Sequence, residues 1–222
     1  MKHLQTYKNY KINESIVKPF DFSELIGQLK ETSFSSLEEI NKISEKYGII
    51  FSDFDTFYNT LARESEKKVA PKDLMLFGGV KFALFNKYID KINIVVESEI
   101  FFEYLHNDED KTDFYNFIHQ VLRHESIHKQ QVSKMGKDIY RLDASPTGNQ
   151  KSYWSNPQEI MAYAHSLVND LMDQGHNKEE ITDILKHEKN IKSWIHQVHK
   201  KYLDPNKYKK FMKYAYEYID TL

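Results

Sequence analysis

Hydrophobic residues recur at helical spacing in two stretches of the second half of the chain. The first stretch follows Asp110 and Thr112, either of which can cap a helix, and it ends before Gly136, a residue type common at helix ends. The second opens at Asn156 and Pro157, which suit the N-cap and first position of a helix. Both stretches therefore predict amphipathic helices. The apolar positions of the first are Phe114, Phe117, Ile118, Val121, Leu122, Ile127 and Val132.

Shorter patterns precede these two helices. Ser36 and Glu39 have the spacing of a capping box, and Gly48 suits the end of the helix that this box would open. The elements predicted for this N-terminal part are helices over 22–31, 36–47 and 53–62 and a short strand over 49–51.

Three apolar runs separated by turn-forming residues predict a small antiparallel sheet before the first long helix. The runs cover 74–77, 80–85 and 92–97. Residues 92–96 are expected to be an edge strand that pairs with an extended substrate, and a plain hairpin packed on the helix fits the same pattern equally well. The predicted fold class is α+β, mainly helical, with the sheet preceding the long helix.

The C-terminal region is predicted to be helical and rich in lysine, and Asp204 with Pro205 starts its final helix. Aromatic residues alternate with lysines over 186–213, a pattern that a nucleic-acid-binding surface shares. A solvated lysine face over an aromatic core stripe explains the pattern more simply. Nucleic acid is therefore disfavoured as a partner.

Composition sets limits on the whole chain. With 222 residues, of which 40% are hydrophobic, the chain can bury a core in one domain. We expect a single domain over 1–222, with a mostly helical part (1–70), a part holding the sheet and the two long helices (72–172), and a helical annex (175–222). The chain has no cysteine, which excludes disulfide scaffolds, thiolate metal sites and cysteine proteases.

The first ten residues lack the apolar core of a signal peptide, and no run of apolar residues is long enough to cross a bilayer. A cytoplasmic protein with no membrane partner is therefore expected. A virion component would have the same features.

The most informative motif is His124-Glu125-Ser126-Ile127-His128. In a helix it places two imidazoles one turn apart on one face, where both can bind the same ion, and this H-E-x-x-H pattern is typical of zinc peptidases. Glu125 lies about 100° round the helix, where it can approach a metal-bound water without being a ligand. The alternative interpretation is a pair of hydrogen-bonded core histidines, which is costly for two titratable rings beside a carboxylate.

A zinc site needs a third protein ligand. The metzincin class is excluded, because Gln131 and Lys134 stand where that class continues with glycine and histidine. Glu159, at the start of the second helix, is the candidate ligand. Its alternative role is in a capping box with Asn156, and the preceding motif favours ligation.

Other candidates for the third position are Asp138, Asp143 and His165. The two aspartates lack the surroundings of an aspzincin, and His165 lies about 240° round the helix from Glu159.

These residues resemble a known group of enzymes. The sequence His124-Glu125-x-x-His128-x-x-Gln131, followed by Asn156-Pro157-x-Glu159-Ile160-x-Ala162-Tyr163-Ala164, is similar to the zincin-like metallopeptidases of gluzincin type found in bacterial and phage proteins. The resemblance covers roughly residues 90 to 170. It implies a zincin-like domain with one Zn²⁺ per chain, held by His124, His128 and Glu159.

The expected function is hydrolysis of peptide or protein substrates by a zinc-activated water, with Glu125 as general base. Tyr163, Tyr153, Arg141 and Tyr140 are candidates for stabilising the oxyanion, and Tyr163 lies one turn beyond Glu159. Arg141 and Tyr153 belong to the segment 137–155 between the long helices, where substrate contacts are expected. The alternative function is that of an inactive zincin-like protein with a binding or structural role, associated with nucleic acid or a virion.

Overall fold

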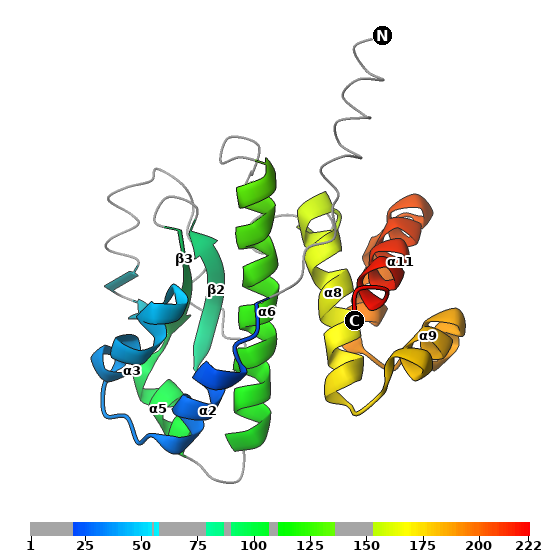
Figure 1. The fold of residues 1–222 in the computed structure, drawn as a ribbon. Coiled ribbons are helices and arrows are strands. Elements are labelled where there is room, and N and C mark those ends of the chain that lie inside the picture. The colour runs from blue at the N-terminus through cyan, green and yellow to red at the C-terminus, as the bar shows by residue number, and fades with distance from the viewer. Residues whose placement is uncertain (1–19, 55, 58–78, 87–89, 107–110, 136–152) are drawn as a thin grey trace. The chain divides into compact units, whose positions relative to one another are not determined.

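The structure, a computed structural model, describes residues 20–54, 56–57, 79–86, 90–106, 111–135 and 153–222 (Figure 1). The described residues form two compact units. We call them the sheet unit, which runs up to Lys129, and the helical unit, which begins at Gln130. Helix α6 (Lys111–Met135) is one uninterrupted helix that contributes to both. The fold is mainly helical with one small sheet, and the predicted α+β class is confirmed.

The sheet has three described strands in the order β1 (Ile49–Asp53), β3 (Lys91–Val96), β2 (Val80–Asn86). β2 runs antiparallel to β3, whereas β1 runs parallel to it. The predicted antiparallel pairing of 80–85 with 92–97 is confirmed, but the sheet is mixed, because the strand predicted at 49–51 joins it in parallel, a pairing that was not predicted. A strand that precedes its partner by some forty residues can return in either direction, because the connection is long enough for a crossover.

The central strand of this sheet is β3, so the prediction that 92–96 form an edge strand was wrong. Its residues Ile92, Ile94, Val95 and Val96 are all at most 1% exposed. Near-continuous burial of this kind indicates that both faces of β3 are covered. Since its backbone is already paired on both sides, β3 cannot take up an extended substrate by strand addition.

The other helices of the sheet unit are α2 (Ser23–Glu31), α3 (Leu37–Ser44) and α5 (Ser98–His106), with a 3-10 turn η1 (Glu45–Tyr47) after α3. Ser36 caps α3 as predicted, since its hydroxyl accepts from the Glu39 amide at 3.3 Å. The Glu39 carboxylate reaches the Ser35 amide, at 2.8 Å. Gly48 ends η1 in the left-handed conformation, with φ of 74°.

Aromatic side chains hold α6 in the sheet unit. Phe101 of α5 contacts both Phe51 of β1 and Phe114 of α6, with ring centroids 5.6 and 5.5 Å apart. The hydroxyl of Tyr115, the next residue of α6, donates to the Leu29 carbonyl of α2 at 2.7 Å. These contacts fix the first half of α6 against α5 and α2, and α5 in turn against β1.

Gly79 is the residue of this unit most sensitive to an added methyl group. Its φ is 77°, and a Cβ there would lie 2.8 Å from the Phe101 Cα, while its carbonyl accepts from the Glu97 amide. Gly79→Ala is expected to lower the free energy of unfolding by about 2–4 kcal/mol, through left-handed strain and overpacking. Urea denaturation measures this. Gly27→Ala, at a helical position with open space, is the control and should stabilise slightly.

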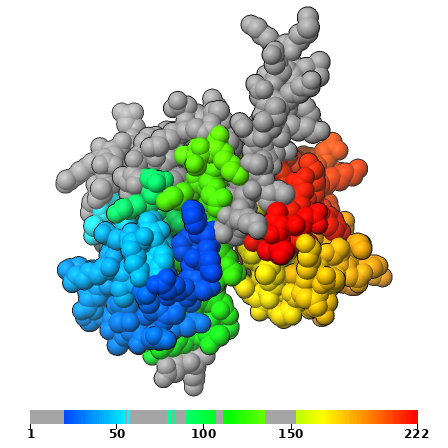
Figure 2. Space-filling view, viewed as in Figure 1, coloured from blue at the N-terminus to red at the C-terminus, as the bar shows by residue number. Residues whose placement is uncertain are grey.

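The helical unit contains α8 (Pro157–Asp173), α9 (Lys178–Lys186), a 3-10 turn η2 (Glu188–Asn190), α10 (Trp194–Tyr202) and α11 (Pro205–Ile219). α11 packs on both α8 and α9, and in Figure 2 its red surface adjoins that of α9. As predicted, Asp204 caps α11, because its carboxylate accepts from the Asn206 and Lys207 amides at 3.0 Å. The core of the unit includes Leu167, Val168, Leu185, Phe211 and Ala215.

The aromatic residues of α11 face this core. Phe211 and Tyr214 are buried, whereas Lys209 and Lys213 of the same helix are exposed. The interpretation of a lysine face over an aromatic stripe is confirmed for α11.

None of the helices in the described ranges has the length and apolarity needed to span a membrane.

Several predictions fall outside the residues that the structure describes. They are the strand at 74–77, the helix at 53–62 beyond Phe57, and the segment between α6 and α8 up to residue 152.

Candidate metal centre

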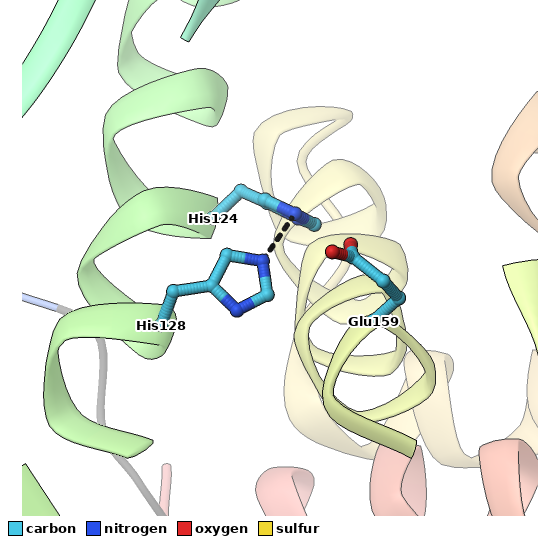
Figure 3. Close-up of side chains that lie close together, drawn as sticks. All are labelled: His124, His128 and Glu159. Atoms are coloured by element: carbon cyan, nitrogen blue, oxygen red, sulfur yellow. Dashed lines mark hydrogen bonds between the residues drawn. The ribbon is translucent and has the colours of Figure 1, made fainter. Parts of the chain in front are cut away.

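The two histidines of the H-E-x-x-H motif lie on α6 and direct their rings at one point. His124 is 9% exposed and His128 3% exposed. Their Nε2 atoms are 3.1 Å apart, and the two ring planes are nearly perpendicular, at 79° (Figure 3). Because a helix places residues i and i+4 on the same face, local backbone geometry alone produces this pairing.

The opposite face of α6 anchors the motif. Ser126, between the two histidines, is fully buried and accepts a hydrogen bond from the Phe20 amide at 3.2 Å while donating to the Arg123 carbonyl at 2.7 Å. Leu122 and Ile118, on the same side as Ser126, are also buried in the sheet unit. The motif is therefore held on its far side by packing and by one tertiary hydrogen bond.

Lys129 follows His128 directly, and its charge is paired with an acidic residue. Its ammonium contacts the Asp90 carboxylate at 3.6 Å and the Asp90 carbonyl at 3.3 Å, next to the start of β3. A neighbouring cation would oppose the binding of a positive ion. Here that cation already has an acidic partner.

Glu159 is the third residue of α8, and the start of this helix is capped without it. The Asn156 side chain accepts from the Gln158 amide at 2.9 Å. The Asn156 amide, which a capping box would pair with Glu159, donates to the Tyr153 carbonyl at 3.0 Å. The alternative interpretation of Glu159 as a capping residue is therefore not supported.

Glu159 instead lies with the histidines. One ligand atom from each of His124, His128 and Glu159 can be chosen so that all three are within 4.8 Å of one another. Figure 3 shows the Glu159 carboxylate directed toward the two rings. Glu159 is half-buried as a residue, and its Oε2 atom is shielded from solvent. Two imidazoles and a carboxylate so arranged could hold a metal ion, and no other group of this kind occurs in the described ranges.

Glu125 stands beside this group on α6 and is 8% exposed. As position i+1 after His124, it projects about 100° away from the His124 direction. It is not one of the three grouped side chains.

Tyr163 and Tyr153, the two described tyrosines that were predicted to stabilise the oxyanion, lie together. The hydroxyl groups of Tyr163 and Tyr153 are 3.1 Å apart, and the Trp154 ring contacts the Tyr163 ring at a centroid distance of 4.9 Å. Because side chains on a helix lean toward its N-terminus, Tyr163 covers the turn that carries Glu159. Arg141 and Tyr140 lie outside the described residues, as do Asp138 and Asp143.

His165, the remaining alternative ligand, belongs to the core of the helical unit. Its ring stacks on Tyr218 of α11 with a centroid distance of 4.2 Å and an interplanar angle of 6°. It is 2% exposed. The prediction that it faces away from Glu159 is confirmed.

Gln131 belongs to the motif that carries the family resemblance, but no role beside the metal group was predicted for it. Gln131 lies one turn after His128 and is only 3% exposed. Its Nε2 donates to the Gln158 carbonyl at 3.1 Å, within the helical unit. The signals in the sequence were its place in that motif and its position, as a long polar residue, on the same helix face as the two histidines.

Comparisons of this chain with protein-family models, with curated proteins and with solved structures gave no match. The case for its function therefore rests on its own residues.

Proposed function

We propose that this protein is a zinc-dependent metallopeptidase whose metal ligands are His124, His128 and Glu159. The observation that carries the proposal is the convergence of two imidazoles and one carboxylate within 4.8 Å. Three protein ligands leave a fourth position for water or substrate, as in catalytic zinc sites. Structural zinc sites usually close all four positions and favour cysteine, which this chain lacks.

The spacing of the histidines supports zinc. Two nitrogens bound tetrahedrally at about 2.05 Å are about 3.3 Å apart. The Nε2 atoms here are 3.1 Å apart. Little adjustment of either ring is therefore needed. The three ligand atoms lie within 4.8 Å of one another, and rotation of the Glu159 side chain can bring its carboxylate closer to the two nitrogens.

A zinc ion held by these three residues would act as a Lewis acid and would make a bound water acidic enough to lose a proton near neutral pH. Glu125 would take that proton, since it follows His124 directly on α6 and is not one of the three grouped side chains. The same carboxyl group can then return the proton to the leaving amine. Its low exposure, 8%, limits competing exchange with bulk water.

Metal removal tests this function. The purified chain is expected to carry about one zinc and to cleave members of a fluorescence-quenched peptide library. A chelator should abolish cleavage, and added zinc should restore it. His187→Ala, which alters an exposed histidine, is the control and should behave as the unaltered protein. Cleavage that continues after complete metal removal would contradict the proposal, and zinc binding without any cleavage would favour the inactive, structural alternative.

A further inference from the structure

We infer that Gln131 is a positioning residue, which sets the location of Glu159 relative to the histidine pair through the Gln158 carbonyl. The inference rests on the proposed function, because it concerns the third ligand of that site. It assigns Gln131 no contact with metal or substrate.

Gln131 lies on the same face of α6 as the two histidines. Three residues after His128, it lies about 4.5 Å farther along the helix axis and about 60° from His128 in rotation. Its side chain is therefore on the histidine face, on the turn that follows the pair. At 3% exposure it is buried, so its amide must find partners within the protein.

The partner of the Gln131 amide is the backbone carbonyl of Gln158. Gln131 Nε2 donates to the Gln158 carbonyl oxygen at 3.1 Å. The Gln158 carbonyl and the Cα of Glu159 belong to the same planar peptide group. The hydrogen bond therefore restrains the peptide plane that carries Glu159, and Gln131 itself is fixed relative to His128 by the rigid geometry of α6.

The N-terminal turn of α8 is where such a restraint has the largest effect. The first turn of a helix lacks part of its internal hydrogen bonding and frays most readily. Asn156 caps this turn from within the same segment of the chain, through the Gln158 amide. The Gln131 amide supplies a hydrogen bond from α6 to this turn of α8. Residues that orient metal ligands without binding the metal change metal affinity about 10- to 100-fold.

The test is a double-mutant cycle on zinc affinity. Gln131→Met removes the donor at nearly constant volume and is expected to weaken zinc binding about tenfold or more. In a Glu159→Ala background the same change should have little further effect, because the bond acts through Glu159. The visible absorption of the cobalt-substituted protein provides a second readout, since it changes when the coordination of the ion changes. Gln130→Met, the adjacent position on another face of α6, is the matched control and should keep both affinity and spectrum.

The outcomes separate the two proposals. Equal zinc affinity and cobalt spectra for Gln131→Met and the unaltered protein would overturn the role of Gln131 alone, as would equal losses with and without Glu159. A chain that binds zinc independently of Glu159 would instead overturn the ligand assignment. If Gln131→Met fails to fold, Gln131→Asn, which keeps the amide but shortens its reach, should give the same loss of affinity and serves in its place.

Discussion

Replacing Glu125 with glutamine is expected to lower kcat for peptide hydrolysis about 10²- to 10⁴-fold while the protein keeps its zinc. The amide has nearly the shape of the carboxylate but cannot accept a proton. Because Glu125 is not among the three grouped side chains, its replacement leaves the metal ligands in place. Peptide hydrolysis measured together with zinc content per chain reports both halves of this prediction.

The control for this substitution is Glu103→Gln, which makes the same chemical change on the exposed side of α5. It should alter neither hydrolysis nor zinc content. If Glu125→Gln lost its zinc along with activity, Glu125 would be a ligand. If it kept full activity, the general base would have to be another group.

Replacing Glu159 with alanine is expected to weaken zinc binding about 100-fold or more. The free energy of zinc binding in structural sites is about 10–16 kcal/mol over four ligands, which gives each ligand a share of about 3 kcal/mol, and 1.4 kcal/mol corresponds to a factor of about ten. Without metal, the variant should unfold at nearly the same urea concentration as the unaltered chain, because Asn156 caps α8 through the Gln158 amide.

Two variants separate ligation from helix capping. Asn156→Ala should reduce the free energy of unfolding by about 1 kcal/mol and leave the zinc content unchanged. Glu179→Ala removes an acidic residue from the first turn of α9 and should change neither property appreciably. The ligand assignment would fail if Glu159→Ala lost only stability and bound zinc as tightly as before.

Local signals in the sequence were enough for α6, α8 and α11, whereas α5 was not predicted. The start of α8 at Pro157 and of α11 at Pro205 follows from capping residues that act on amides two or three positions away. The helical spacing of apolar residues located α6, although the structure begins it at Lys111 and includes Thr112 within it. Such features depend on neighbouring residues alone.

The arrangement of the sheet depends on residues far apart in the chain. The pairing of Ile49 with Ile92 is parallel and spans more than forty residues, and nothing in either strand encodes that direction. The run from Ile94 to Val96 did carry a signal, since consecutive apolar residues indicate a strand buried on both faces.

The metal group likewise combines a pairing set by neighbouring residues with a contact between residues far apart in the chain. His124 and His128 could be placed together from their spacing, because one helical turn separates them. Glu159 required a contact between two helices, which spacing cannot establish. The role of Gln131 was not predictable, because a side chain that donates to a backbone carbonyl on another helix leaves no pattern in the sequence.

The central claim is that His124, His128 and Glu159 bind one zinc ion. Diffraction data collected on both sides of the zinc absorption edge, from crystals of the zinc-loaded chain, test it most directly. We expect a single anomalous peak about 2.0–2.2 Å from both histidine Nε2 atoms and from a Glu159 carboxylate oxygen. A peak at other residues, or a direct His124–His128 hydrogen bond with no anomalous density beside it, would contradict the account.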